Sequence, residues 1–291
     1  MAPSFDTTRT PGGHPRVTVV SSGLANLPRV SAVPDDVQAD EVLAAALVTE
    51  AAALAQLMRR ERGADLDRDT KSGVSDIVTA ADHAAEALVV ERLAALRPDD
   101  GVLGEEGASR PSRSGRTWVL DPVDGTYNFA QGLDWWCSAA ALEVDGEPVL
   151  GAVRHDGSAT TWVGGRDVAP TRNGEPLAPL VDRPLAQACV ATYLHPPWIG
   201  TEVAAAFDRF AARAATLRML GSGTMDAMAV ADGRVHLVCQ HTVPPWDWMP
   251  GAAVVRALGG EVRHVEAAGR TWYVAGVPTA VAEAADLLAD R

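Results

Sequence analysis

The sequence predicts a layered protein of mixed α/β (α+β) class. Two long helical patterns occupy the first part of the chain, and short apolar runs separated by turn dipeptides follow in the middle. After about residue 185, helical and strand patterns alternate. Apolar residues make up 47% of the chain and charged residues 22%, a composition typical of globular proteins. Helices and sheets of this kind bury their apolar faces by stacking in layers.

Two helices are predicted near the start. The first runs from Asp36 to Arg60, because apolar residues recur there at helical spacing. The second runs from Ala80 to Leu96, and Pro98 ends it. Thr79 and Asp82 have the spacing of a capping box, which favours a helix start at this point.

Strands are predicted next. A short apolar strand covers Thr117–Leu120. The dipeptides Asp145-Gly146 and Asp156-Gly157 are typical hairpin turns and predict a β-meander across residues 135–164. Asn173-Gly174 predicts a further turn.

The last third alternates between strand and helix. The predicted elements are a strand at Ala188–Tyr193, helices at Glu202–Ala215 and Thr224–Ala231, a strand at Val235–Cys239, and helices at Met249–Leu258 and Thr279–Ala289.

We expect three regions along the chain. Residues 1–34, rich in Pro, Gly, Ser and Thr, form a flexible extension. Residues 35–180 form an N-terminal α+β part, and residues 181–291 form a C-terminal α/β part. The boundary falls in the stretch Arg166–Pro184, which is rich in Pro, Arg and Asp.

Charge and cysteine content exclude several classes. The net charge of −13 argues against nucleic acid or an anionic membrane as partner. The three cysteines are scattered, which argues against a disulfide framework or a zinc site. We see no apolar run of the roughly 20 residues that span a bilayer and no signal-peptide pattern. The expected location is the cytoplasm.

The segment Trp118–Phe129 carries the strongest chemical signal. An apolar strand delivers Asp121 to its end, and Asp124 follows three residues later. Two carboxylates at such a turn can share Mg²⁺, which prefers oxygen ligands. Gly125 lets the backbone approach a ligand closely, and a helix starting near Thr126 can offer N–H groups to phosphate. An ordinary Asp-Gly turn is the alternative.

Three further segments add acidic residues. They are Gly104-Glu105-Glu106-Gly107, the stretch from Lys71 through Asp76 to Asp82, and Trp246-Asp247-Trp248. Each has an ordinary explanation as well: a solvated acidic loop, a capping box and a helix N-cap, respectively. Together they bring carboxylates from distant parts of the chain to one candidate site.

Taken in order, these four segments resemble the inositol monophosphatase family of magnesium-dependent, lithium-sensitive phosphatases. The resemblance runs from about Val37 to the C-terminus and rests on the patterns DPxDGTxNF and WDxxxGA. It implies a layered α/β/α/β/α sandwich of the inositol monophosphatase and fructose bisphosphatase type. It also implies a homodimer, two or three Mg²⁺ ions, and attack on phosphate by a metal-activated water.

Carried over position by position, the resemblance implies specific roles. The metal ligands would be the carboxylates of Glu105, Asp121, Asp124 and Asp247 and the carbonyl of Val123. Gly125 and Thr126 would bind the phosphate through backbone N–H groups. Thr126 and Asp82, with Glu105, would orient the attacking water. Lys71, Asp76 and Glu106 would lie on accessory segments beside the site.

The chain departs from the family pattern on the substrate side. Gln240 stands seven residues before Asp247, where inositol-specific members carry a Glu that binds a substrate hydroxyl. Gly223 and Thr224 match the family's substrate-side turn. Asp226 is expected either to face a hydroxylated substrate or to cap the helix. These departures leave the chemistry in place and bear on the choice of substrate.

The predicted activity is therefore hydrolysis of a small polyol or sugar-like monophosphate. Inositol monophosphate is the preferred substrate, and histidinol phosphate, a fructose bisphosphate and an adenosine bisphosphate are the alternatives. Two other classes were weighed. A non-catalytic relative would be expected to lack a metal carboxylate, and a metal-buffering protein would not need the strand and turn around Asp121.

Overall fold

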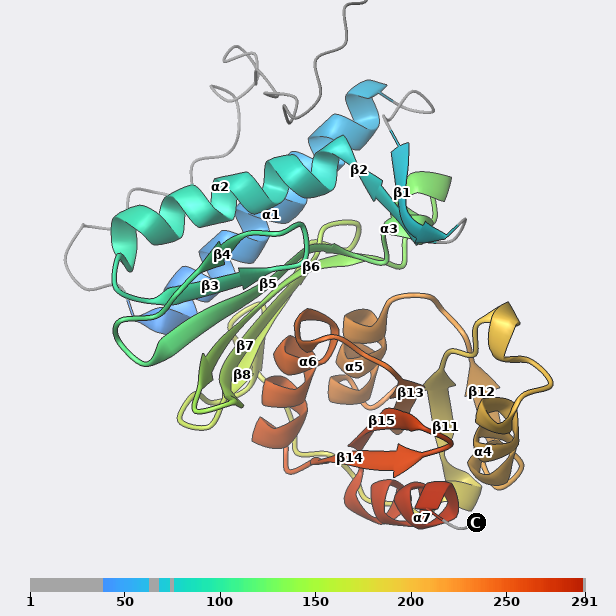
Figure 1. The fold of residues 1–291 in the computed structure, drawn as a ribbon. Helices are drawn as coiled ribbons and strands as arrows, with labels where there is room; N and C mark the ends of the chain where they lie inside the picture. The colour runs from blue at the N-terminus through green and yellow to red at the C-terminus, as the bar shows by residue number, and fades with distance from the viewer. Residues whose placement is uncertain (1–38, 63–67, 74–75, 290–291) are drawn as a thin grey trace, which may run out of the picture.

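The computed structural model describes residues 39–62, 68–73 and 76–289 (Figure 1). Side chains are described throughout these ranges except between residues 62 and 78. The predicted extension at residues 1–34 and the predicted helix start at Asp36 lie outside the described part.

The first two helices are α1 (Asp40–Arg62) and α2 (Ala80–Leu96), which pack against each other. Residue 39 is not helical, so α1 begins later than predicted and ends two residues later. The predicted capping box at the start of α2 is confirmed: Thr79 and Asp82 exchange side-chain and backbone hydrogen bonds. Between the two helices, β1 (Arg68–Gly73) and β2 (Asp76–Thr79) form an antiparallel pair.

The length and hydropathy of α1 differ from expectation. The segment Asp40–Glu61 is long and apolar enough to cross a membrane, although the sequence analysis expected no segment of this kind. Leu43, Leu47 and Val48 on this helix are at most 2% exposed, because they pack on the sheet below. The apolar character of α1 is therefore that of a core helix.

The larger sheet has eight strands in the order β10-β9-β8-β7-β6-β5-β3-β4. Their bounds are β3 (Gly101–Gly104), β4 (Ser109–Arg110), β5 (Arg116–Asp124), β6 (Cys137–Val144), β7 (Glu147–His155), β8 (Thr160–Gly165), β9 (Thr171–Arg172) and β10 (Glu175–Pro176). The predicted meander is confirmed as the antiparallel run β6-β7-β8. Its first turn has positive φ at Asp145 and Gly146, 55° and 82°, as a type I′ hairpin requires.

The smaller sheet has five strands in the order β12-β11-β13-β15-β14. Their bounds are β11 (Cys189–Thr192), β12 (Thr216–Arg218), β13 (Leu237–His241), β14 (Glu261–Ala267) and β15 (Arg270–Gly276). The strand predicted at Val235–Cys239 is shifted by two residues. The β14–β15 hairpin was not predicted. Its turn at Ala268-Gly269 lacks an Asn or Asp signal, although both residues have positive φ.

The remaining helices confirm the alternating pattern. They are α3 (Thr126–Gln131), η3 (Leu185–Gln187), η4 (Pro196–Trp198), α4 (Glu202–Ala211), α5 (Gly223–Ala231), α6 (Pro245–Ala257) and α7 (Pro278–Ala289). Two boundaries are corrected. The helix predicted to end at Ala215 ends at Ala211, and α6 begins at Pro245 rather than Met249, because proline is well tolerated in the first helical turn.

These elements stack as helices, sheet, helices, sheet, helices, which confirms the layered fold (Figure 1). Helices α1 and α2 cover one face of the larger sheet, and α5 and α6 lie between the two sheets. Helices α4 and α7 cover the outer face of the smaller sheet. One apolar core joins residues on both sides of the predicted boundary at residue 180, such as Val153 and Val254. That boundary stays a prediction.

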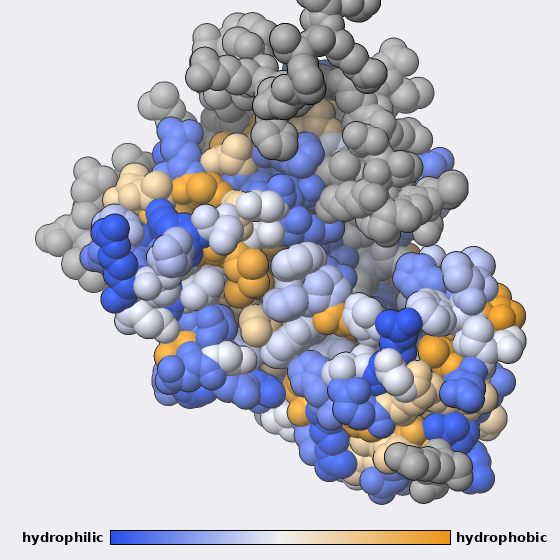
Figure 2. Space-filling view, viewed as in Figure 1, coloured by the Kyte–Doolittle hydropathy of each residue, from blue (hydrophilic) through white to orange (hydrophobic). Residues whose placement is uncertain are grey.

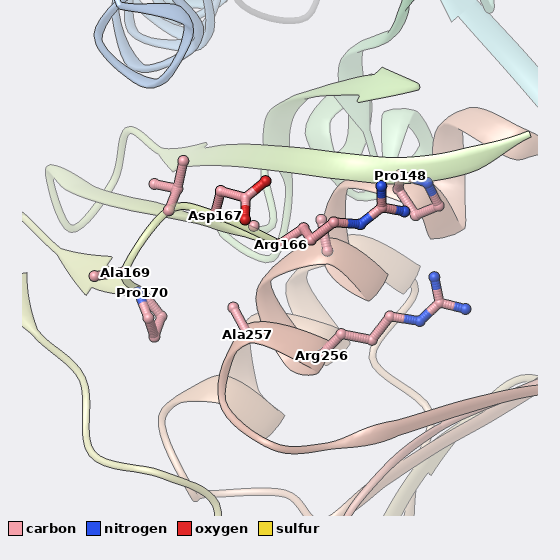
Figure 3. Close-up of a pocket in the computed structure, with 10 residues that line it drawn as sticks. Pro148, Arg166, Asp167, Ala169, Pro170, Arg256 and Ala257 are labelled. Carbon is pink, nitrogen blue, oxygen red and sulfur yellow. The ribbon is translucent and has the colours of Figure 1, made fainter. Parts of the chain in front are cut away.

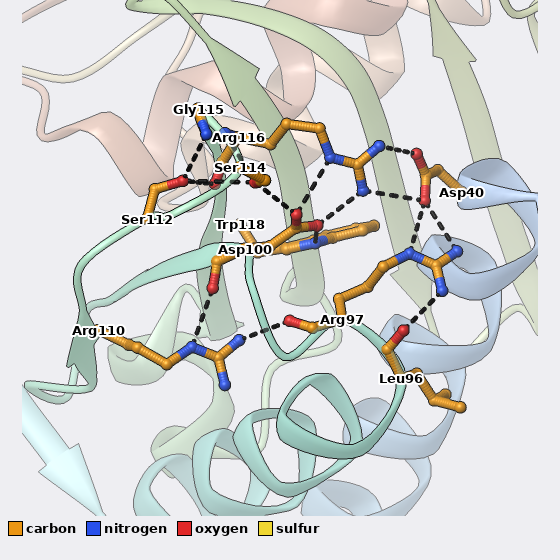
Figure 4. A network of polar contacts seen from close by, with 10 residues as sticks. All are labelled: Asp40, Leu96, Arg97, Asp100, Arg110, Ser112, Ser114, Gly115, Arg116 and Trp118. Atoms are coloured by element: carbon orange, nitrogen blue, oxygen red, sulfur yellow. Dashed lines mark hydrogen bonds and ion pairs between the residues drawn. The ribbon is translucent and has the colours of Figure 1, made fainter.

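A polar network fixes the start of α1 to the larger sheet (Figure 4). Asp100, which is 4% exposed, accepts hydrogen bonds from Arg116, Ser114 and the indole of Trp118. Arg116 also donates to Asp40 at the start of α1.

The surface is mainly hydrophilic on the face shown in Figure 2, as expected from the high net charge.

Candidate active site

Three carboxylates from distant parts of the chain converge at one point. Glu105 lies between β3 and β4, Asp121 in β5, and Asp247 in the first turn of α6. One carboxylate oxygen from each lies within 4.8 Å of the other two. Asp121 is 1% exposed, and the other two are partly buried. Three oxygen donors at this spacing can hold a divalent cation.

A bulge in β5 brings Asp121 and Asp124 to the same face. The predicted strand ended at Leu120, but β5 continues to Asp124. Asp121 pairs with Ala139 and Asp124 with Cys137, so β5 contains one extra residue between these pairs. Residues three apart in a regular strand point to opposite faces, and the extra residue restores the same side. Pro122 lies within the bulge, where a missing N–H costs no ladder bond.

Asp124 lies next to this group and is anchored from α5. Its Oδ2 accepts hydrogen bonds from Ser222 Oγ at 2.8 Å and from the backbone N–H of Thr224 at 2.6 Å. Burial raises the pKa of Asp124, although these hydrogen bonds oppose the effect. This oxygen is therefore directed toward the start of α5. Asp124, which the sequence pattern predicts to be a metal ligand, thus also joins β5 to α5.

The Asp-Gly-Thr segment connects the site to α2. Gly125 is the N-cap of α3 with φ of 89°, and an added Cβ would lie 3.0 Å from both Ser222 Cβ and the Trp135 carbonyl oxygen. Thr126 Oγ1 lies 3.0 Å from Asp82 Oδ1 and 2.9 Å from the carbonyl oxygen of Val123. The hydroxyl proton can serve one of these acceptors at a time.

Asp82 contacts both the start of α2 and Thr126. One oxygen closes the capping box with Thr79, and the other faces Thr126. Burial raises the pKa of Asp82, and hydrogen bonds from Thr79 and Thr126 oppose that rise. The residue is 1% exposed, so its carboxylate is a fixed part of the site.

The loop that carries Glu105 is held by Glu86 of α2. Glu86 is 6% exposed, and its two oxygens accept the backbone N–H groups of Glu106 and Ala108, each at 2.9 Å. A Cβ on Gly104 would lie 2.1 Å from Glu86 Oε2, so a glycine is required for this approach. The Glu106 side chain is 2% exposed and lies 3.7 Å from His83.

The electrostatics of the cluster favour a cation. Burial raises the pKa of Asp121 well above its usual range, and the negative charges of Glu105, Asp124 and Asp247 raise it further. A divalent cation would offset this accumulation of negative charge and satisfy the carboxylate oxygens, so these residues fit a metal.

The substrate side of the cluster is formed by α5 and β13. Thr224 Oγ1 donates to the carbonyl oxygen of Asp247 at 3.1 Å, which joins α5 to α6. Gln240 Nε2 lies 3.5 Å from Asp226 Oδ2, and Trp135 Nε1 donates to Asp226 Oδ1 at 3.1 Å. Asp226 is 0% exposed, and the N-cap of α5 is Ser222, so Asp226 does not cap the helix.

Comparison with known proteins now decides the family. The sequence model of the inositol monophosphatase family matches residues 38–290. The chain belongs to the inositol monophosphatase family. It is thus a phosphomonoesterase-family hydrolase of a metal-dependent kind, and the acidic cluster could bind the metal.

Two curated relatives have different names. An inositol-1-monophosphatase of Mycobacterium leprae is 34% identical over 254 residues, covering 79% of this chain and 86% of the relative. A histidinol-phosphatase of Mycobacterium tuberculosis is 32% identical over 231 residues, covering 78% and 88%. The solved structure of Mycobacterium tuberculosis SuhB has a TM-score of 0.71 at 27% identity, covering 85% of this chain and 94% of SuhB.

Several further positions of this inositol monophosphatase family member were predicted to lie at or beside the site. The side chains of Lys71 in β1 and Asp76 in β2 lie outside the described part of the structure. The phosphate contacts of Gly125 and Thr126 and the substrate contacts of Gly223, Thr224, Asp226 and Gln240 stay predictions.

Sequence reasoning missed three residues that build the family site. Glu86 follows Asp82 by four residues, a helical spacing that places both on one face of α2 and could have identified it. Ser222 anchors Asp124. Asn128 donates to the carbonyl oxygens of Trp135 and Leu220, at 2.8 and 2.7 Å, and so ties α3 to the chain before α5. The bonds of Ser222 to Asp124 and of Asn128 to Leu220 span 98 and 92 residues of chain. Asn128 belongs to the DPxDGTxNF pattern, but the local sequence does not give its distant partner.

An open cavity of about 710 Å³ lies elsewhere in this family member (Figure 3). It is lined by Pro148, the stretch 165–170 and the last turns of α6, and it contains none of the predicted site residues. Arg256 on its wall is paired with Glu147 at 2.6 Å. The carboxylate cluster, which has perturbed acids and oxygen donors at metal spacing, is the better candidate for chemistry.

Proposed function

We propose that this phosphatase hydrolyses a small polyol monophosphate, with inositol monophosphate as the first choice. The observation that carries the proposal is the convergence of Glu105, Asp121 and Asp247, with Gln240 across the start of α5. A relative named inositol-1-monophosphatase, 34% identical, supports the choice of substrate.

The proposed cofactor is Mg²⁺, as two or three ions. The groups that would hold it are the carboxylates of Glu105, Asp121, Asp124 and Asp247 and the carbonyl oxygen of Val123. These are hard oxygen donors of the kind that Mg²⁺ prefers. When bound, Mg²⁺ lowers the pKa of a coordinated water and offsets the negative charge that develops on the phosphate.

The chain's own groups then orient the water and manage its proton. Thr126 Oγ1 donates to Asp82 or to the Val123 carbonyl, and its lone pairs can accept a hydrogen from the attacking water. Asp82, with its pKa raised chiefly by burial, is suited to receive a proton passed through Thr126. Glu105 would offer a second acceptor to this water.

The phosphate would lie over the start of α3. Gly125 permits this turn because its φ is 89° and because a side chain there would meet Ser222 and Trp135. The backbone N–H groups of Gly125 and Thr126 would contact phosphate oxygens. The substrate's remaining hydroxyls would face Gly223, Thr224 and Gln240.

Further properties are proposed from the family resemblance. They are inhibition by lithium at millimolar concentration, assembly as a homodimer and a cytoplasmic location, without nucleic acid or membrane partners. The net charge of −13 supports the last point, because an acidic surface is repelled by both kinds of polyanion.

Histidinol phosphate is the second candidate substrate. A relative named histidinol-phosphatase is 32% identical to this chain, close to the 34% of the inositol monophosphatase relative. The identities alone therefore do not separate the two substrates.

A substrate panel tests the proposal. Phosphate release is measured with inositol 1-phosphate, histidinol phosphate, fructose 1,6-bisphosphate and adenosine 3′,5′-bisphosphate, each with Mg²⁺ or EDTA. The expected result is Mg²⁺-dependent release that is fastest with inositol 1-phosphate. Faster release from histidinol phosphate would establish the second candidate, and equal release with EDTA would contradict metal-dependent chemistry.

A further inference from the structure

The hairpin between β7 and β8 contains a histidine that the proposed chemistry does not use. His155, the last residue of β7, is 8% exposed. Its Nε2 lies 2.7 Å from the carbonyl oxygen of Asp134, and its Nδ1 lies 2.8 Å from Ser158 Oγ. Asp134 belongs to the segment between α3 and β6, so His155 contacts a part of the chain outside its own hairpin. A buried ring with a partner at each nitrogen is held in one orientation.

The two contacts determine which nitrogen of the imidazole carries the hydrogen. A carbonyl oxygen can only accept a hydrogen bond, so Nε2 must carry the hydrogen and donate to Asp134. In the neutral ring Nδ1 is then an acceptor, and the hydroxyl of Ser158 donates to it. Thr160 Oγ1, at 2.8 Å from Ser158 Oγ, can donate to the serine in turn. His155 therefore presents one N–H group, and this group is directed at the Asp134 carbonyl.

The next carbonyl along the chain is held by a second side chain. Asn128 Nδ2, from α3, donates to the carbonyl oxygen of Trp135 at 2.8 Å. Two successive carbonyl groups are thus held by side chains from different elements. A peptide group is planar, so turning the Asp134 carbonyl changes a backbone dihedral of Trp135 and with it the direction of the next carbonyl. Loss of the His155 bond would therefore loosen the Trp135 carbonyl as well.

The Trp135 carbonyl lies against the turn that is proposed to bind phosphate. The point where a Cβ of Gly125 would lie is 3.0 Å from this carbonyl oxygen and 3.0 Å from Ser222 Cβ. Ser222 is fixed by its hydrogen bond to Asp124. The carbonyl is fixed by the contacts described above. The position of Gly125, and of the N–H groups proposed to hold the phosphate, therefore depends partly on His155.

We propose that His155 is a positioning residue for the phosphate group, because its hydrogen bond keeps the Trp135 carbonyl against Gly125 and so fixes the phosphate-binding turn. The inference rests on the proposed phosphatase function and adds a residue of the β7–β8 hairpin to it. In this role His155 contacts neither the substrate nor the metal. Its effect is on the affinity for the phosphate group itself, whatever alcohol the phosphate is attached to.

The experiment distinguishes the two nitrogens of His155. In His155→Gln the amide NH₂ group reaches the position of Nε2 and can donate to Asp134, whereas in His155→Asn it reaches only the position of Nδ1. Inhibition by inorganic phosphate is measured with the full-length enzyme, Mg²⁺ and inositol 1-phosphate as substrate. The matched control is Trp162→Phe in the neighbouring strand β8, which removes the hydrogen bond from the buried Trp162 to Asp232.

We expect His155→Asn to raise the inhibition constant of inorganic phosphate about fivefold, as for the loss of one hydrogen bond. KM for inositol 1-phosphate should rise by a similar factor, because both molecules use the same phosphate-binding turn. His155→Gln is expected to restore the inhibition constant to within about twofold of wild type, and Trp162→Phe to leave it within the same range. A contact that served stability alone would change the Tm without changing this constant.

A second measurement does not depend on the folding of His155→Asn. Nitrogen NMR of the imidazole rings distinguishes a nitrogen that carries hydrogen from one that does not, and the signals that disappear in His155→Gln belong to His155. The expected form of the neutral ring has its hydrogen on Nε2.

Three outcomes would overturn the inference while leaving the proposed function intact. They are equal inhibition constants in His155→Asn and His155→Gln, an increase in Trp162→Phe as large as that in His155→Asn, and a neutral ring with its hydrogen on Nδ1. Absence of Mg²⁺-dependent hydrolysis of the whole substrate panel by the wild-type enzyme would instead overturn the proposed function, and the inference with it.

Discussion

Asp121 shows at the scale of one residue how burial and like charges create a metal site. Its carboxyl group is 1% exposed and has Glu105, Asp124 and Asp247 as charged neighbours. A basic side chain next to Asp121 would have formed an ion pair that stabilises the fold but does not bind a metal. Acids brought together instead favour a cation from solution, at a cost in stability to the metal-free protein.

The substitution Asp121→Asn tests whether Asp121 belongs to a metal site. The substitution keeps the shape but removes the charge and one oxygen donor, and we expect turnover to fall at least about a thousandfold, equivalent to about 4 kcal/mol. Phosphate release measures the effect, and circular dichroism checks that the fold is retained. Asp145→Asn, in an exposed hairpin turn, is the control and should keep full activity. Full activity in Asp121→Asn would remove this residue from the metal site.

Site residues that lie close together in the sequence were easier to predict than those that lie far apart. Asp121 and Asp124 lie in one short pattern, so their chemistry was visible in the sequence. Glu105 and Asp247 were found through the resemblance, and the structure brings both to Asp121. Ser222 was not predicted, because its bond to Asp124 spans 98 residues and a single serine carries no pattern.

The element scale shows how strands and helices aim these side chains. The bulge in β5 turns Asp121 and Asp124 to one face, and Glu86 on α2 holds the loop of Glu105. The bulge was not predicted, since an Asp-Pro-Val-Asp stretch is also typical of a turn. The β14–β15 hairpin was missed for the opposite reason, because its Ala-Gly turn has no strong signal.

Glu86→Gln tests the support of the Glu105 loop. Glutamine keeps one acceptor oxygen but presents an NH₂ group to a backbone N–H, which leaves one of the two loop donors unpaired. We expect the Mg²⁺ concentration for half-maximal activity to rise about tenfold, or about 1.4 kcal/mol. Glu91→Gln, on an exposed position of the same helix, is the control. An unchanged Mg²⁺ requirement with lower thermal stability would mean that Glu86 serves the fold alone.

The network around Asp100 makes a prediction about stability alone. Burial by itself would raise the pKa of Asp100, but hydrogen bonds from Arg116, Ser114 and Trp118 outweigh it and hold the pKa below its usual range. A lowered pKa means that the ionised group stabilises the fold above the usual aspartate range and loses this effect as pH falls.

We therefore expect Asp100→Asn to lower the free energy of unfolding at pH 7 by about 2 kcal/mol, since Arg116 loses a buried partner. The difference from wild type should shrink near pH 3. Urea unfolding at the two pH values measures it, with the exposed neighbour Asp99→Asn as control. A deficit of the same size at both pH values would contradict the charge argument.

At the scale of the whole molecule, the layered arrangement was predictable and the join between its parts was not. Periodicity predicted the early helices, the meander and the later alternation, and the resemblance supplied the order of layers. The packing of α5 and α6 between the two sheets depends on contacts between residues far apart in sequence, such as Val153 and Val254. No local pattern carries that information.

Metal should stabilise the whole fold in a pH-dependent way. Asp121 and Asp124 have raised pKa values, so the metal-free protein is most stable when they are protonated and loses stability as pH rises through those values. Mg²⁺ reverses this loss by replacing the protons, and about 2.7 kcal/mol is expected at a hundred times Kd.

Thermal unfolding with and without Mg²⁺ measures the effect. We expect the rise in Tm to be about 5 °C at pH 7.5 and smaller at pH 5. Asp121→Asn should show little rise at either pH, which separates the site from weak surface binding. A rise of equal size in that variant would contradict binding at the carboxylate cluster.

The position of α5 and α6 between the sheets also has a kinetic consequence. Glu105 and Asp121 belong to the larger sheet and its loop, whereas Asp247 and Ser222 come from the helical layer that also packs on the smaller sheet. A refolding chain that has formed only one sheet therefore lacks a complete set of ligands. Recovery of metal affinity should coincide with the last docking event and lag behind the return of secondary structure, which would make the metal a reporter of that step.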